Sequence, residues 1–427
     1  MSKLDRDLGP LSRRDVLTAG LVLAAGGEAL KAGYAAVPDA FARGVYAANR
    51  EGLRRDQVLV MIQLAGGNDG LRTLVPLQDG RLHDLRPTLS AASVSQALPL
   101  DANFGLHSRL NGIKALWDEG RVAIVHGVGY PDPSYSHFES IRVWETGDPS
   151  RRQLDGWLGR TLAQGYDSAG HPLTGCACGA TSTPGMMRDA RSTVAVIQDR
   201  QSYGFANDDL QAIVGSVYRE TPGIYGALFD TTVAALRGTV AELDRALPPA
   251  DSGSDAPPSY SQDPGNQLAQ ALKLGAQLII AGTGVRLLHV TLDGFDTHSG
   301  ERDAHDQLMG FLDESITGFY TEVAQHGLAS NVLLATWSEF GRRPGENDAG
   351  GTDHGSAAPL LLIGDPVRGG RYGQQPDLGR LDDDGNVAYT VDFRSVYQEI
   401  LETHFGTDAS KILGGRFERL RFLNAGG

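Results

Sequence analysis

Five short polar motifs carry the side chains of this chain that are best suited to chemistry. They are Gly66-Gly67-Asn68-Asp69-Gly70, Ser134-Tyr135-Ser136-His137-Phe138, Asp293-Gly294-Phe295-Asp296-Thr297-His298, Ser338-Glu339-Phe340-Gly341-Arg342 and Gly351-Thr352-Asp353-His354-Gly355. Each motif combines carboxylates, imidazoles or a hydroxyl with glycine, and at least three follow an apolar run typical of a buried strand. Because functional groups concentrate in loops held by a rigid scaffold, the pattern predicts one polar site at strand ends.

Four of these side chains form a candidate ligand set for a metal ion. Asp296 and His298 are two residues apart, and in an extended loop both can face one point. Glu339 follows an apolar run, and His354 lies in a glycine-flanked loop. Taken alone, the Asp296 and His298 pair is better explained as a polar turn after a strand, but four candidate ligands together favour a shared site. Mixed oxygen and nitrogen ligands suit a divalent cation, and the residues leave Zn, Mg, Mn and Ca open.

Asp69 is a further candidate because it follows the apolar run of residues 58–62 through a glycine-rich turn. Open α/β sheets bind ligands at the carboxyl ends of their strands, which is where this carboxylate is expected. The alternative is a turn in which Asn68 and Asp69 bond only to the backbone.

A hydroxyl and an imidazole stand side by side where a helix is expected to begin. Ser136 precedes a probable helix that runs through Trp144, so Ser134 or Ser136 is a candidate N-cap. The positive end of the helix dipole would also stabilise an anionic group, and a nucleophilic role for Ser136 is compatible with capping. His137 is a candidate acid or base, although neighbouring side chains on a helix diverge.

Apolar runs define the scaffold that must position these groups. Continuous runs that fit strands covered on both faces lie at residues 58–62, 122–125, 287–292, 332–336 and 359–363. Helical patterns lie at residues 110–119, 266–280, 303–326 and 393–405. Strands that alternate with helices predict an α/β fold with a mostly parallel sheet covered by helices on both faces.

The length of 427 residues suits one large domain with an insertion. We expect a single α/β domain over residues 57–427, with a cap or inserted region at about 156–246. Residues 248–265 are rich in Pro, Ser, Asp and Gly and predict a mobile linker.

The N-terminus predicts an export signal over residues 1–36. Arg13-Arg14 precede the short apolar stretch 17–30, and small residues follow near Ala35. Because this stretch is shorter than the roughly 20 residues that a bilayer requires, we expect no permanent membrane span. The expected partner is the twin-arginine export machinery, and the expected location is the periplasm or the exterior.

Charge and cysteine content limit the other classes of function. The net charge of −14 would repel a polyanion, so we expect no nucleic-acid partner. The two cysteines, Cys176 and Cys178, are expected to point to opposite faces of an extended segment, which would make a mutual disulfide awkward. Ordinary thiols are favoured over a redox or metal role.

The motifs also resemble those of a known family. The Arg-Arg leader, the five motifs above, Trp144-Glu145-Thr146-Gly147 and Asp392-Phe393-Arg394 together resemble the DUF1501 proteins, an exported bacterial family. The order of motifs is specific, and the resemblance covers nearly the whole chain. That family is in turn similar to the alkaline phosphatase and sulfatase superfamily, which implies an alkaline phosphatase-like fold.

This resemblance implies roles for particular residues. It implies that Asp69, Asp296, His298 and His354 are metal ligands and that Ser136 is the nucleophile. Where the superfamily usually has an Asp-His pair, this chain has Glu339-Phe340, which argues against a centre with two zinc ions. The sulfatase motif Cys-x-Pro-x-Arg is absent.

Two hypotheses about function follow. The first is an exported, metal-dependent hydrolase of phosphate or sulfate esters that acts on a small-molecule or polymer substrate, with Arg142 or Arg342 offsetting negative charge. The second is a non-catalytic protein that keeps the fold for cell-surface binding or assembly, which Phe340 favours. A serine hydrolase of carboxylic esters lacks the expected Gly-x-Ser-x-Gly motif.

Overall fold

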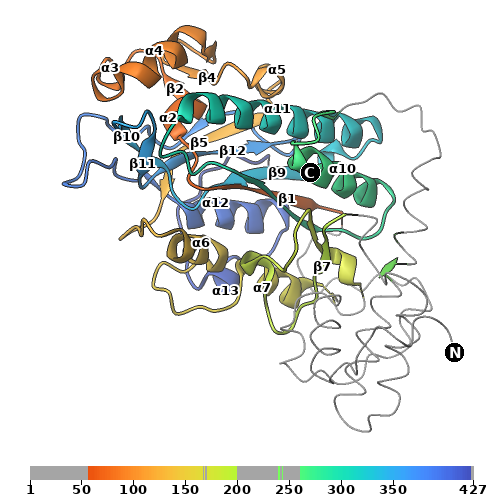
Figure 1. The fold of residues 1–427 in the computed structure, drawn as a ribbon. Helices are drawn as coiled ribbons and strands as arrows, with labels where there is room; N and C mark the ends of the chain where they lie inside the picture. The colour runs from red at the N-terminus through yellow and green to blue at the C-terminus, as the bar shows by residue number, and fades with distance from the viewer. Residues whose placement is uncertain are drawn as a thin grey trace, which may run out of the picture.

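Nine strands pair into one sheet at the centre of the computed structural model (Figure 1). Across the sheet they are β13 (Gly370–Tyr372), β5 (Val122–Gly129), β12 (Ala358–Ile363), β9 (Val332–Trp337), β1 (Val58–Ala65), β8 (Leu287–Asp293), β6 (Gly175–Cys178) and β7 (Ala195–Ile197), with β14 (Val391–Asp392) beside β5. In this sheet only β12 runs antiparallel to its neighbours. The carboxyl ends of β1, β5, β8 and β9 therefore meet at one edge.

The structure describes residues 56–166, 168, 171–199, 239–240, 243 and 260–424. The predicted export segment, residues 1–36, lies outside this part of the chain. Of the predicted linker, residues 248–259 also lie outside it. The predicted division into domains stays a prediction.

The strands form where the sequence is continuously apolar. In β1, Val58, Val60 and Ile62 belong to one buried cluster, and Leu59 and Met61 belong to another. Successive side chains of a strand point to opposite faces, so a run without polar residues needs cover on both sides. All five strands predicted from apolar runs are confirmed.

Helices supply that cover on both faces. Helices α5 (Asn111–Asp118), α10 (Gln267–Ile280) and α11 (Glu301–Gln325) pack on the face of Val58 and Val60. On the face of Leu59 lie α6 (His137–Thr146), α7 (Trp157–Gly165), α12 (Phe393–Glu399), which continues as a π-turn over Ile400–His404, and α13 (Ser410–Leu413). The predicted α/β class, with a mostly parallel sheet covered on both faces, is confirmed.

Smaller elements extend the sheet edge that carries the polar motifs. Helices α2 (Gly70–Thr73), α3 (Arg81–Leu85) and α4 (Pro87–Gln96) accompany a small sheet of β2 (Leu74–Pro76), β4 (Phe104–Leu106) and β3 (Leu98–Pro99). Strands β10 (Arg342–Glu346) and β11 (Thr352–His354) form a separate antiparallel pair. Short 3-10 turns cover Pro172–Thr174, Gly185–Met187 and Ala329–Asn331.

The region expected to form a cap, residues 156–246, is described in part. Its strands β6 and β7 pair in parallel next to β8 and so extend the central sheet. Helix α7 packs against the core on the face of Leu59. The described part of this region is therefore continuous with the main fold.

The expectation that the two cysteines point to opposite faces of the segment is wrong. Cys176 and Cys178 lie on the same face of β6, and their Sγ atoms are 3.6 Å apart. The physical reason is the two-residue period of a strand, which places residues i and i+2 on one face. Both thiols are buried and free.

In the part of the chain that the structure describes, no helix combines the length and the apolar character that crossing a membrane requires.

A buried histidine of the central sheet, His289, should make the folded protein less stable in acid. Neither ring nitrogen of His289 has a hydrogen-bond partner among the described residues, and burial lowers its pKa to about 4. Because the unfolded chain binds this proton near pH 6.5, the free energy of unfolding should fall as the pH drops from 7 to 4, by at most about 3 kcal/mol. His289→Leu should remove this loss in urea unfolding at pH 7 and pH 5. The control variant His326→Leu, at an exposed histidine, should keep the acid-dependent loss of stability. Equal pH dependence of the unfolding free energy in both variants would contradict the prediction.

Candidate metal centre

The polar motifs meet at the shared edge of the sheet. Asp296 follows β8, Glu339 follows β9, and His137 opens α6 after β5. Residues Ala65 of β1 and Asp293 of β8 pair in register, so the loops that follow these strands start side by side. Parallel direction and aligned register therefore bring distant parts of the sequence together.

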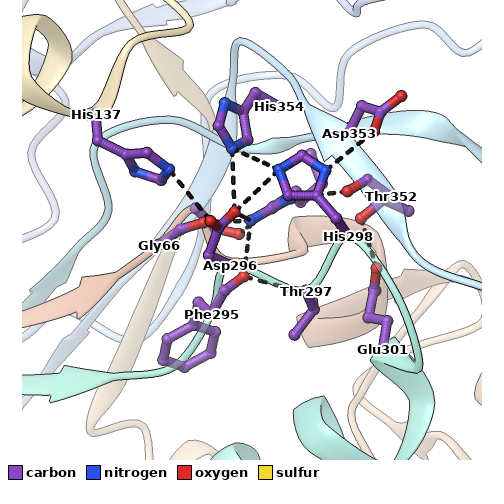
Figure 2. A network of polar contacts seen from close by, with 12 residues as sticks. Gly66, His137, Phe295, Asp296, Thr297, His298, Glu301, Thr352, Asp353 and His354 are labelled. Carbon is purple, nitrogen blue, oxygen red and sulfur yellow. Dashed lines mark hydrogen bonds and ion pairs between the residues drawn. The ribbon is translucent and has the colours of Figure 1, made fainter.

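Three histidines surround the Asp296 carboxylate, as Figure 2 shows. His137 Nε2 lies 3.6 Å from Asp296 Oδ2, and His298 Nε2 and His354 Nε2 each lie 3.1 Å from Asp296 Oδ1. The Nε2 atoms of His298 and His354 are 3.0 Å apart. One ligand atom from each of His137, Asp296 and His354 lies within 4.8 Å of the others. Ligand atoms about 2 Å from one zinc ion stand roughly 3–4 Å apart, so this spacing fits a shared cation.

The opposite ring nitrogen of each histidine is already engaged. His137 Nδ1 lies 2.7 Å from Glu339 Oε1, His298 Nδ1 lies 3.1 Å from Asp353 Oδ1, and His354 Nδ1 lies 2.8 Å from the Tyr135 carbonyl oxygen. A carboxylate or carbonyl oxygen can only accept, so each Nδ1 must carry the N–H. In the neutral imidazoles the Nε2 lone pairs then face one another. Metal-binding histidines are oriented in this way, and the residues present fit a cation.

The buried side chain of Arg342 holds the Asp296 carboxylate in place. Its fully buried guanidinium donates to Asp296 Oδ1 at 2.7 Å and to the carbonyl oxygens of Phe295, Gly67 and Gly66. Partial burial would raise the pKa of Asp296, but the hydrogen bond and the charge of Arg342 lower it to about 2. Asp296 is therefore ionised at neutral pH, and Arg342 offsets charge within the protein.

The charges of the site suit a divalent ion. The carboxylates of Asp296, Glu339 and Asp353 each contact a histidine. The guanidinium of Arg342 donates to Asp296. Three carboxylates stand against the guanidiniums of Arg342 and, near Asp353, of Arg343, so negative groups outnumber positive ones around the histidines. The hydrogen bond from His298 lowers the pKa of Asp353, so that carboxyl is also ionised at neutral pH.

Two glycines and an aromatic ring shape the wall beside the histidines. Gly66 has φ 115° and Gly67 has φ 87°, and a Cβ on Gly66 would meet the Asp296 backbone nitrogen. A Cβ on Gly67 would stand 2.6 Å from the Phe340 ring. That ring lies with its centroid 4.9 Å from the centroid of His137 and 4.5 Å from that of His354. Phe340 therefore presents an apolar ring, which offers no ligand atom, to His137 and His354.

Glu339, expected as a ligand, acts mainly through His137 in this geometry. Its side chain is buried, and Oε1 accepts hydrogen bonds from the Gly66 amide at 2.8 Å and from His137 Nδ1 at 2.7 Å. Oε2 is buried and has no hydrogen-bond partner among the described residues. Glu339 thus orients the imidazole through Oε1, while its Oε2 stays buried without a partner among the described residues.

Asp69, also expected as a ligand, is paired elsewhere. Its Oδ2 lies 2.5 Å from Arg86 Nη1, with both side chains 1% exposed, and its Oδ1 accepts from the Leu71 amide as the N-cap of α2. Burial would raise the pKa of Asp69, but the charge of Arg86 holds it well below its usual range. Burial and the charge of Asp69 raise the pKa of Glu301 to about 8, and Glu301 accepts from Thr352 Oγ1 at 2.5 Å. Asp69 therefore belongs to a buried ion pair under the site, separate from the histidines.

Ser136 lies at the N-cap of α6, directly before His137, and is exposed. Its side chain makes no capping hydrogen bond. Ser134 Oγ instead bonds to Glu139 and accepts from the Ser136 amide at 3.2 Å. The Ser136 hydroxyl is thus not committed to the helix. Arg142, in contrast, donates to the Arg151 carbonyl oxygen, away from the histidines.

Sequence reasoning missed Arg86 and Glu301 and gave His137 a different role. Arg86 and Glu301 carry no motif signal, since an arginine before proline and an acid in the first turn of a helix are common. Thr352 lies within a polar motif, but its bond to Glu301 was not predicted. His137 was taken as an acid or base, whereas its Nε2 points at Asp296 with the other imidazoles. The presence of Asp353 inside a polar motif was the available signal for its contact with His298.

We expect Glu339→Gln to weaken metal binding by about 10- to 100-fold, the range seen when the partner of a histidine ligand is changed. The amide keeps the size of the carboxylate but removes the charge that makes His137 more basic. Metal titration monitored by calorimetry measures the change, with exposed Glu314→Gln on α11 as the control. Equal affinity in the two variants would show that Glu339 plays no part in ion binding.

The comparisons with known proteins agree with this architecture. The chain belongs to the family described as "Protein of unknown function (DUF1501)", whose sequence model matches residues 126–423. That span includes His137, Asp296, His298, Glu339 and His354. No curated protein sequence matches the chain.

Three solved structures show what the chain is similar to at low identity. One is a protein in the alkaline phosphatase superfamily from Vibrio parahaemolyticus (10% identity, 96% of this chain and 78% of that chain, TM-score 0.41). Another is Ps i-CgsB in complex with k-i-k-neocarrahexaose (10% identity, 85% and 73%, TM-score 0.37). A third is the C-terminal periplasmic domain of EcEptC from Escherichia coli in complex with Zn (10% identity, 75% and 76%, TM-score 0.37). None of these matches assigns an activity to this chain.

Proposed function

We propose that this protein is a metal-dependent hydrolase of phosphate or sulfate esters. The observation that carries the proposal is the convergence of three imidazole Nε2 atoms on the Asp296 carboxylate, with every Nδ1 held by an acceptor. In this arrangement the three Nε2 atoms and the Asp296 carboxylate oxygens present only lone pairs to one another. Such a set is suited to a cation.

The donor set favours zinc or another transition metal. His137, His298, His354 and Asp296 would hold the ion through three nitrogens and one oxygen. Calcium and magnesium prefer oxygen ligands only, whereas zinc and its neighbours accept imidazole. When bound, the cation would polarise the ester and stabilise the negative charge that develops on it.

Ser136 is the proposed nucleophile. Its Oγ would attack the phosphorus or sulfur atom, and the bond from that atom to the leaving alcohol would break. The hydroxyl proton passes to solvent, and the alcohol takes up a proton. Water would then hydrolyse the serine ester, which releases phosphate or sulfate and restores the hydroxyl. The uncommitted side chain at the start of α6 supports this role.

Turnover of p-nitrophenyl phosphate and p-nitrophenyl sulfate tests the proposal. We expect activity that EDTA abolishes, that Zn or Mn restores better than Ca, and that Ser136→Ala lowers by at least about 100-fold. Ser330→Ala, at an exposed serine before β9, is the control. Metal-loaded protein that cleaves neither ester nor any other phosphate or sulfate monoester would contradict the proposal.

A non-catalytic role with a single bound ion is the second candidate. The Phe340 ring against His137 and His354 favours it, because that ring leaves no room there for another nitrogen ligand. In that case metal would raise the unfolding temperature, while Ser136→Ala would change neither turnover nor the cellular phenotype.

We also propose that the protein works in the periplasm or outside the cell after twin-arginine export. Arg13-Arg14 and the apolar stretch that follows support this location. Replacing both arginines with lysine should retain the protein in the cytoplasm on cell fractionation. Unchanged export of that variant would count against the pathway.

A further inference from the structure

A cavity of about 720 Å³ opens at the far end of α6 from the candidate metal centre. Helix α6 starts at His137 in that centre and ends at Thr146 on the cavity wall. At 1.5 Å per residue, about 15 Å separate the two ends of this helix. Pro131 and Asp132, from the loop before α6, also line the cavity. In Figure 1 the surrounding helices α6, α7 and α13 lie together on one side of the sheet. The cavity therefore shares no side chain with the cluster of histidines.

The charges of the cavity are mostly positive, although the protein carries a net charge of −14. Its cationic lining residues are Arg152, Arg160, Arg394 and Lys411, and its acidic lining residues are Asp132 and Asp148. Arg160 is buried and donates to the carbonyl oxygens of Ile412 and Thr146, which ties the walls together. Arg152 and Lys411 are exposed. The charge of Lys411 also acts on Asp408.

The two acidic residues of the cavity wall, Asp148 and Asp132, differ in how their carboxylates are hydrogen-bonded. Asp148 accepts from the amides of Ser150, Arg152 and Gln153 and from the Ser150 hydroxyl, at 2.6–2.9 Å. Burial would raise the pKa of Asp148, but the bonds from Ser150 and these amides lower it, so Asp148 is an ionised carboxylate whose oxygens are bonded to its own loop. The side chain of Asp132 has no such ring of donors.

One wall of the cavity is aromatic and apolar. Arg394 is paired with Asp392 through Nε and Nη2, and its guanidinium lies 4.4 Å from the centroid of the Phe417 ring. Ile412 and Leu413 continue the apolar lining. A charged rim beside an apolar wall fits a ligand that joins an anionic group to a ring or a short aliphatic body.

We propose that this cavity binds a soluble phosphate or sulfate monoester through Arg152, Lys411 and the Phe417 ring. The volume lies in the range of sites for small organic ligands, about 300–1,000 Å³. Because the cavity lies outside the metal centre, this binding does not depend on the proposed hydrolysis. A substrate with several ester groups would be held here at a second point.

Calorimetric titration of the full-length protein with phenylphosphonate tests the inference. This probe has a tetrahedral oxyanion and an apolar ring, and its carbon–phosphorus bond is not an ester bond. We expect the probe to bind His354→Ala protein, in which the metal centre is disrupted. Adding Arg152→Gln and Lys411→Gln should weaken that binding at least tenfold.

The matched control adds Lys273→Gln and Arg302→Gln, which remove the same two charges from α10 and α11 on the opposite face of the sheet. Here the affinity should change less than twofold. All four side chains are exposed, so these variants should fold. Equal affinity in the two sets, or loss of all binding in His354→Ala alone, would overturn the inference. Binding to vesicles with anionic phospholipid, together with no binding of phenylphosphonate, would also overturn it.

Discussion

The His354→Ala variant is expected to lose its metal ion and its ester hydrolysis together. His354 Nε2 lies 3.1 Å from Asp296 and 3.0 Å from His298 Nε2, so its removal opens the centre of the proposed ligand set. Changing a residue behind a ligand costs about 10- to 100-fold in metal affinity, and losing a ligand should cost more than about 100-fold. Metal analysis of purified protein and the rate of monoester hydrolysis measure the two effects.

His326→Ala is the matched control for this variant. His326 is an exposed histidine at the end of α11, and its Nδ1 bonds only to the Glu322 carbonyl oxygen of the same helix. This control should keep the metal content and the turnover of the unchanged protein. Normal metal content in His354→Ala would contradict the ligand role of His354.

Arg86→Met is expected to destabilise the fold more than a change at the surface. Arg86 pairs with Asp69 at 2.5 Å, and it also donates to the carbonyl oxygens of Pro344 and Arg343 at 2.7 Å each. Methionine would leave the Asp69 carboxylate buried beside Glu301 without its paired cation, with only the more weakly acting Arg72 nearby. Breaking a buried pair in this way costs about 3–5 kcal/mol, which urea unfolding at pH 7 measures.

Arg81→Met tests whether burial is the cause. Arg81 pairs with Asp79 and Asp377, but its side chain is half exposed. Exposed ion pairs contribute about 0–1 kcal/mol, so this control should unfold close to the unchanged protein. Similar losses in both variants would refute the account of Asp69 and Arg86 as a buried structural pair.

The layers of the fold were readable from the sequence because its central strands are covered on both faces. Runs such as Val58 to Ile62 contain no polar residue, and only a strand buried on both sides tolerates that. The order of the strands was not readable. The antiparallel direction of β12 depends on tertiary pairing with β5 and β9, which no local pattern encodes.

The candidate site was predictable as a set of motifs but not as a set of contacts. Glycine-flanked motifs marked Asp296, His298 and His354 before any geometry was known. Asp69 illustrates the limit, because its environment depends on Arg86, a residue that has no motif and is brought close only by folding. The prediction for Cys176 and Cys178 failed because it placed residues i and i+2 of a strand on opposite faces, whereas they share a face.

X-ray absorption spectroscopy of the zinc-loaded protein tests the central claim most directly, because it reports the atoms around the ion without a substrate. We expect about one zinc per chain, with nitrogen and oxygen ligands at roughly 2.0–2.1 Å and outer-shell scattering from about three imidazoles. His354→Ala should lose most of this signal. A zinc ion surrounded by oxygen alone, or protein that binds no stoichiometric metal, would contradict the account.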